Sequence, residues 1–106
     1  MAKLFAYGSL QETDVQQTIF GRTLKGDADS LIGYTVTKIE IEEEFGMASY
    51  PIITSTEKLQ DIIVGLLYEI TDDELLQADT YEGVHYKRME VLLESNQIAW
   101  TFTATN

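Results

Sequence analysis

The most strongly apolar segment of the chain runs from Asp61 to Ile70 and includes the sequence Ile-Ile-Val-Gly-Leu-Leu-Tyr. A short apolar run of this kind, bounded by polar residues, predicts a central β-strand. Gly65 lies in its middle, and glycine weakens a strand because it offers no side chain for packing. The glycine therefore indicates a bulge, or a close approach of a ligand or of another backbone.

Two short helices are indicated by capping residues and by the glycines that follow them. A helix over residues 13–20 and a helix over residues 71–82 would each end at a glycine, the residue most often found just after a helix. Segments 9–12 and 13–16 both fit a capping box near the first helix, and segment 71–74 fits one at the start of the second.

The remaining elements are expected to be strands. They are expected at residues 3–7, 29–37, 38–42, 52–54, 61–70, 86–93 and 98–105, with a loop at 43–50. This order of elements predicts a mixed α+β domain with a sheet curled around its core. A chain of 106 residues supports one core, so a single domain over residues 1–106 is expected.

Composition and charge exclude several classes of protein. The net charge of −11, from 18 acidic and 7 basic residues, would repel a phosphate backbone, so nucleic acid is excluded as a partner. No apolar stretch approaches the roughly 20 residues of a membrane span, and no signal peptide is recognisable. The chain has no cysteine, which suits a reducing compartment, so a cytoplasmic protein is expected. An anionic small substrate is still compatible with this net charge, because the few basic side chains can be concentrated at one site.

Glu82 is the strongest candidate for a catalytic residue. It would lie in the last helical turn, where the partial negative charge of the helix end disfavours a carboxylate. It follows Leu75 by seven residues and Ala78 by four, so it shares the helix face that should turn inward. Desolvation and the helix dipole would both raise its pKa toward the range of a general base.

Other interpretations of the role of Glu82 remain open from the sequence. Its side chain can reach solvent or pair with Lys87 or Arg88. Asp79, one turn earlier, is expected to be structural. A glycosidase pair of Asp79 and Glu82 is formally available, but the chain is small for a saccharide cleft, so we discount it.

The segment from Tyr7 to Leu10 is a candidate anion-binding loop. Gly8 follows the expected first strand, where glycine permits a positive φ and lets a ligand approach the backbone. Successive N–H groups of Gly8, Ser9 and Leu10 would then hold a carboxylate. The alternative is a plain turn in which Ser9 acts only as an N-cap.

Further polar and aromatic residues complete the set of candidates. Arg88 is expected either to anchor a substrate carboxylate or to pair with Glu82 or Glu90. His85, the only histidine, is expected in an exposed turn, and one histidine without cysteine makes a zinc site improbable. Four tyrosines are candidates to line a pocket: Tyr7, Tyr34, Tyr81 and Tyr86.

A resemblance to a known family rests on an ordered set of motifs that spans nearly the whole chain. The segment Phe5-Ala6-Tyr7-Gly8-Ser9-Leu10 resembles the signature loop of the gamma-glutamylcyclotransferase-like family, which includes AIG2-like proteins. Further matches follow in order: Gly33-Tyr34, Tyr50-Pro51, Val64-Gly65-x-Leu67-Tyr68-x-Ile70, and Asp79-x-Tyr81-Glu82-Gly83 with Tyr86 and Arg88.

The resemblance implies a small mixed sheet curled into a barrel-like core, with a pocket beside the loop of Tyr7 to Leu10. It also implies that Glu82 is the general acid/base that converts a γ-glutamyl group to 5-oxoproline and releases an amino acid or amine. Substrate contacts would come from Tyr7, Gly8, Ser9, Leu10, Tyr86 and Arg88. The reaction implied here needs no cofactor and no metal.

Two rival functions remain. One is a small-molecule-binding module that keeps the fold and the pocket but performs no chemistry, in line with the shortness of the chain. The other keeps the catalysis and changes the substrate to a γ-glutamylated amine or a biosynthetic intermediate. The sequence is shorter than the best-studied catalytic relatives, so loops that set their substrate choice are expected to be missing.

Overall fold

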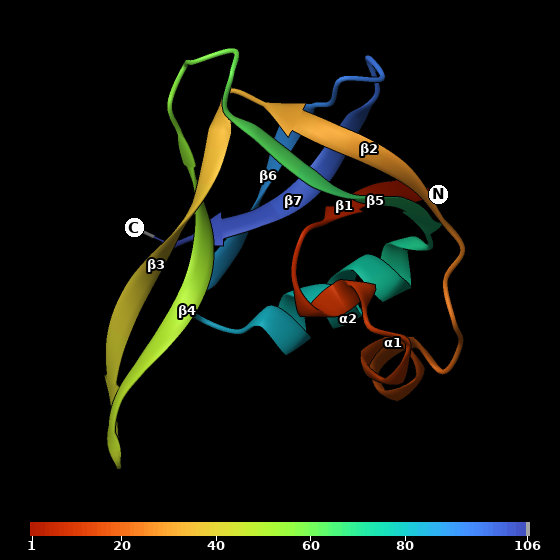
Figure 1. Ribbon diagram of the computed structural model, residues 1–106. Helices are drawn as coiled ribbons and strands as arrows, with labels where there is room; N and C mark the ends of the chain where they lie inside the picture. The colour runs from red at the N-terminus through yellow and green to blue at the C-terminus, as the bar shows by residue number, and fades with distance from the viewer. Residues whose placement is uncertain (106) are drawn as a thin grey trace.

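A five-stranded sheet with the strand order β2-β5-β1-β7-β6 forms the centre of the protein (Figure 1). The computed structural model describes residues 1–105. The strands are β1 (Ala2–Ala6), β2 (Gly26–Ile32), β3 (Tyr34–Glu43), β4 (Gly46–Ser55), β5 (Ile62–Ile70), β6 (Tyr86–Leu92) and β7 (Ile98–Ala104). The helices are the 3₁₀ helix η1 (Ser9–Gln11), α1 (Thr13–Phe20) and α2 (Asp72–Glu82).

Strand β1 is the middle strand and is buried on both faces. It pairs antiparallel with β5 and parallel with β7. Its residues Leu4 and Phe5 point to opposite faces of the sheet and are 0% and 1% exposed. The apolar strand expected at 61–70 is confirmed as β5, which lies inside the sheet between β2 and β1.

Each face of the sheet is covered by a different part of the chain. Both helices lie against one face, where Leu75 and Ala78 of α2 join the core cluster that contains Leu4 (Figure 1). The opposite face packs Phe5 against Ile53 at the base of the β3–β4 hairpin. The protein is therefore a mixed α+β fold with two helices, as expected.

The expected barrel-like closure of the sheet is wrong. Within residues 1–105, strands β3 and β4 pair only with each other and form a separate two-stranded sheet that extends away from the other five strands (Figure 1). In this part of the chain, no further strand pairs with the outer edges of β2 and β6. Side chains attach the hairpin instead, since Thr103 donates to the carbonyl of Ile53 and Tyr86 donates to that of Pro51.

The hairpin also replaces the loop that was expected at residues 43–50. The ladder continues to the pair Glu43 and Gly46, so only Glu44 and Phe45 form the turn. The break between the two preceding strands is at Gly33, which has a φ of 86°, rather than after Thr37. Within residues 1–105, no helix has the length and apolar character that crossing a membrane requires.

Capping is confirmed for the second helix but not for the first. Thr71 and Glu74 form the expected capping box of α2, and both helices end at the expected glycines. The capping boxes expected near α1 are wrong, because neither Gly8 before η1 nor Glu12 before α1 makes a side-chain cap. The side chain of Ser9 instead contacts the hydroxyl of Tyr81 at the end of α2.

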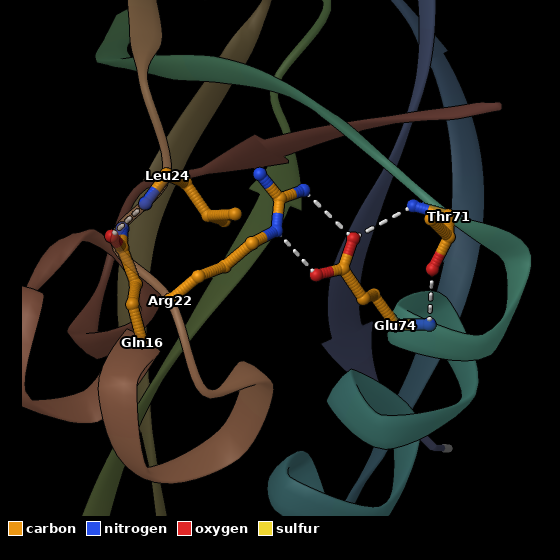
Figure 2. Close-up of polar contacts among 5 residues, drawn as sticks. All are labelled: Gln16, Arg22, Leu24, Thr71 and Glu74. Atoms are coloured by element: carbon orange, nitrogen blue, oxygen red, sulfur yellow. Dashed lines mark hydrogen bonds and ion pairs between the residues drawn. The ribbon is translucent and has the colours of Figure 1, made fainter.

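Polar contacts hold the segment that joins α1 to β2 and fix its position against α2 (Figure 2). Gln16 is fully buried, and its amide donates to the carbonyl of Leu10 and accepts from the backbone N–H of Leu24. Arg22 donates two hydrogen bonds, of 2.7 and 2.9 Å, to the carboxylate of Glu74. The Arg22 hydrogen bonds hold the pKa of Glu74 down at about 2, below its ordinary value of 4.5.

Replacing Gly65 by alanine is expected to destabilise the protein by about 1–3 kcal/mol, because the added methyl group overpacks a full core. Its Cβ would fall on the carbonyl oxygen of Ala6 and within 2.8 Å of the Phe5 ring. Urea denaturation measures the change in the free energy of unfolding. The exposed neighbour Val64 is the control, and Val64→Ala should change the free energy of unfolding by much less. An equal loss of stability in both variants would contradict the close approach of β1 to Gly65.

Replacing Glu74 by glutamine is expected to destabilise the protein at pH 7, on the order of 1 kcal/mol, because one charge-assisted contact is lost. A lowered pKa contributes stability above the unfolded value near 4.5 and loses it as pH falls toward about 2. The difference between wild type and variant should therefore shrink from pH 5 to pH 2, as followed by thermal denaturation. The exposed neighbour Asp73, changed to asparagine, should show no such trend.

Candidate active site

A cavity of about 380 Å³ opens where β1 ends. It lies between the loop after β1, the end of α2, and parts of β4, β6 and β7. The residues that line it are Phe5, Ala6, Tyr7, Gly8, Ser9, Leu10, Tyr50, Pro51, Tyr81, Glu82, Tyr86 and Phe102. The two segments singled out in the sequence, 5–10 and 79–83, thus meet at one cavity.

Glu82 is half-buried in this cavity as the last residue of α2. Leu75 and Ala78, on the same helix face, are buried, so the inward direction expected for this face is confirmed. Burial raises the pKa of Glu82 from 4.5 to about 7. Across the described part of the chain, no side chain or backbone N–H makes a hydrogen bond or ion pair with its carboxylate. The group is therefore poised to exchange protons near neutral pH.

The basic side chain that was expected to contact either Glu82 or the substrate is engaged elsewhere. Arg88 donates to the carboxylate of Asp79 at 2.7 Å, and its guanidinium lies 4.7 Å from the ring centroid of Trp100. Arg88 does not line the cavity. The expected structural role of Asp79 is consistent with this ion pair, and the pairing of Arg88 with Glu82 or Glu90 is wrong.

The loop from Tyr7 to Leu10 lines the cavity along its whole length. Among residues 1–105, none accepts a hydrogen bond from the backbone N–H of Gly8, Ser9 or Leu10. Gly8 does not adopt the positive φ that glycine permits, since its φ is −128°. Ser9 is not an N-cap: its hydroxyl lies 2.7 Å from that of Tyr81, which ties the loop to the end of α2.

Four tyrosines line the cavity, but they are not all the four that were expected. Tyr7, Tyr81 and Tyr86 do so, whereas Tyr34 packs against the core on the hairpin side. The fourth is Tyr50 of β4, whose ring is stacked on His85 at a centroid distance of 6.2 Å. The motif Tyr50-Pro51 was available in the sequence, but residues before it were expected to form a loop, so its place in a wall of the cavity was not deduced.

Two of these tyrosines donate their hydroxyl hydrogens to backbone carbonyls. Tyr7 donates to Phe102 and Tyr86 donates to Pro51, each at 2.7 Å. The pKa of Tyr7 is raised, chiefly by burial and then by the nearby Tyr86 and Glu82. Burial also raises the pKa of Tyr86, with contributions from Glu82 and Tyr50. Both phenols therefore stay protonated at neutral pH.

The described residues contain no cluster of three or more histidine and carboxylate side chains with metal-binding geometry. Phe5, Ala6 and Phe102 were missed as cavity residues because the sequence indicates only that they are apolar. Their role as lining follows from where β1 and β7 end in space.

Replacing Glu82 by glutamine is expected to stabilise the protein by about 1–3 kcal/mol at pH 8 and by much less at pH 5. A raised carboxyl pKa means that the folded protein loses stability as pH rises from about 4.5 to about 7, and glutamine avoids this loss. Urea denaturation at the two pH values measures it. Glu90, exposed on β6, provides the control Glu90→Gln; a gain for Glu82→Gln that is equal at both pH values would contradict the assignment.

Comparison with known proteins agrees with this fold. The family model for gamma-glutamyl cyclotransferase, AIG2-like, matches residues 4–106. No curated protein sequence matches the chain.

Solved structures with the same fold include two Arabidopsis thaliana proteins determined in solution. The chain is 26% identical to one (TM-score 0.78), over 99% of this chain and 62% of the other. It is 27% identical to the second (TM-score 0.73), over 99% and 69%. A structure titled gamma-glutamyl cyclotransferase is 16% identical (TM-score 0.77), over 99% and 67%. This chain thus spans just under two thirds of the first relative. By its family match, the chain belongs to the AIG2-like gamma-glutamyl cyclotransferase family.

Proposed function

We propose that this protein is an enzyme that cyclises a γ-glutamyl group to 5-oxoproline and releases an amino acid or amine. The observation that carries the proposal is the carboxylate of Glu82, half-buried in a cavity, unpaired among the described residues, and with a pKa raised to about 7. A group of this pKa can accept and return a proton near neutral pH, as an acid/base catalyst must.

In the proposed reaction, Glu82 moves the protons while the substrate supplies both reacting groups. Glu82 accepts a proton from the α-ammonium group, and the freed amine attacks the γ-carbonyl carbon. Glu82 then gives this proton to the departing nitrogen as the amide bond breaks, and it transfers the second proton of the α-nitrogen to the released amine in the same way. Two protons leave the α-nitrogen and both end on the released amine, so the overall reaction needs no external acid, base or redox partner.

The loop after β1 is proposed to hold the negative charges of the substrate. The backbone N–H groups of Gly8, Ser9 and Leu10 are available beside the cavity, and fixed dipoles of this kind stabilise a carboxylate or a developing oxyanion. Tyr7 and Tyr86 are proposed as further substrate contacts. Arg88 is left out of this set, because its guanidinium pairs with Asp79 away from the cavity lining.

Ring closure also requires the amine and the carbonyl to be held close together. The walls of the cavity are mainly aromatic and aliphatic, and they limit the conformations of a flexible γ-glutamyl chain. Restricting such a chain to its ring-forming shape supplies a large part of the acceleration of an intramolecular reaction. The aromatic wall from β4 and β6 is proposed to act in this way.

The direct test is an assay for 5-oxoproline with a panel of γ-glutamyl amino acids and γ-glutamyl amines. Glu82→Gln is expected to lower kcat by at least about 10²-fold, the usual loss when a general acid/base is removed. Glu90→Gln, which removes an exposed carboxylate outside the cavity, should keep wild-type activity.

The outcome of the assay separates the proposal from its rival. Product that disappears in Glu82→Gln and persists in Glu90→Gln supports the enzyme. Full activity in Glu82→Gln rules out the mechanism. A wild-type protein that binds members of the panel but forms no product would instead be a binding module on the same fold.

A further inference from the structure

The hydroxyl groups of Tyr7 and Tyr86 have an arrangement that the acid/base role of Glu82 does not by itself explain. Both side chains line the cavity with Glu82, and each donates its one hydrogen to a backbone carbonyl. A phenol has a single hydrogen and oxygen lone pairs. With the hydrogen already donated, each oxygen can only accept a hydrogen bond from a ligand.

The rest of the cavity lining adds no cation. Lysine, arginine and histidine are absent from the twelve lining residues, and so are asparagine and glutamine. Tyr50 donates its hydroxyl hydrogen to Glu43, and the pair of Ser9 and Tyr81 uses one of its two hydroxyl hydrogens internally, which leaves one donor on either Ser9 or Tyr81. Apart from that one hydroxyl hydrogen, the polar side chains that line the cavity with Glu82 present acceptors.

The same arrangement keeps Glu82 basic. A hydrogen bond from either phenol to the carboxylate would stabilise its charged form and lower its pKa. These two hydroxyl groups are instead bonded to the carbonyls of Phe102 and Pro51, and desolvation raises the pKa of Glu82 without a hydrogen-bond donor to oppose it.

We propose that the phenol oxygens of Tyr7 and Tyr86, together with the carboxylate of Glu82, form an ammonium-binding site that positions the α-amino group of the substrate. The inference rests on the proposed function in taking a γ-glutamyl group as the ligand. An ammonium group has three N–H donors, and the site offers three acceptors. When one proton moves to Glu82, the other two N–H groups keep their phenol partners and the nitrogen stays in place.

Tyr7 and Tyr86 are thus positioning residues rather than proton donors, and they select ligands that carry a free α-ammonium group. A purely structural role is the competing explanation, because both hydrogen bonds also tie strands and loops together. The two explanations differ in one measurable respect. Only an ammonium site makes the hydroxyl groups sense whether the ligand has an ammonium group.

The test uses two ligands that cannot cyclise and that differ only in the α-ammonium group: S-benzyl-L-homocysteine and 4-(benzylthio)butanoate. Isothermal titration calorimetry at pH 7.5 measures both dissociation constants. Wild type is expected to prefer the ammonium ligand by roughly tenfold or more, the scale of a charge-assisted hydrogen bond. Tyr7→Phe and Tyr86→Phe should each reduce this preference by roughly three- to tenfold, with unchanged affinity for the butanoate.

Tyr34→Phe is the matched control, since Tyr34 lies outside the cavity lining, and its preference should equal that of wild type. Thermal denaturation verifies that each variant is folded. If Tyr7→Phe does not fold, the comparison of the two dissociation constants is made with Tyr86→Phe alone. A wild-type protein without a preference, including one that binds neither ligand, overturns the assignment. So does a preference that survives both substitutions, or a loss that is equal for the two ligands.

The outcome is distinguishable from failure of the proposed function, because these ligands require no turnover. An ammonium preference that depends on the two phenols, in a protein that forms no 5-oxoproline, supports the proposed binding site and contradicts the proposed reaction. Turnover of γ-glutamyl compounds without such a preference supports the reaction and contradicts the ammonium site.

Discussion

The burial of β1 on both of its faces is the constraint on which the rest of the structure depends. Leu4 faces the helices and Phe5 faces the hairpin, so one short strand joins two cores. Its close approach to β5 is possible because Gly65 has no side chain at the point where Ala6 and Phe5 pass. The backbone leaves this crowded strand directly into the loop of the cavity, and the contact between the hydroxyl groups of Ser9 and Tyr81 ties that loop to the end of α2.

Helix α2 carries two glutamates whose environments have opposite effects. Glu74, in the first turn, accepts hydrogen bonds from Arg22 and Thr71, and its pKa falls to about 2. Glu82, in the last turn, is desolvated beside tyrosines that donate elsewhere, and its pKa rises to about 7. The contacts of Glu74 stabilise the helix at neutral pH. The desolvation of Glu82 lowers the stability of the protein at neutral pH, but it leaves a carboxyl group that can exchange protons.

Much of the local structure could be predicted, because it depends on neighbours in the chain. The capping box of Thr71 and Glu74, the glycine stops and the apolar strand β5 each follow from residues within a few positions of one another. The β3–β4 hairpin was harder, since its two-residue turn of Glu44 and Phe45 lacks the usual turn residues and the strand β3 is rich in charge. The open sheet could not be predicted, because closure depends on which edges meet.

For the site, the sequence by itself determined which carboxylate and which loop are the candidates. The spacing of Glu82 from Leu75 and Ala78 places it on the inward helix face, and Gly8 lies where a strand ends. Only the tertiary structure decided their environment: that Arg88 turns to Asp79, that Tyr50 arrives from the hairpin, and that the phenols donate to carbonyls. The physical reason is that a helix face is set by local geometry, whereas desolvation and hydrogen-bond choice depend on residues brought together from distant parts of the chain.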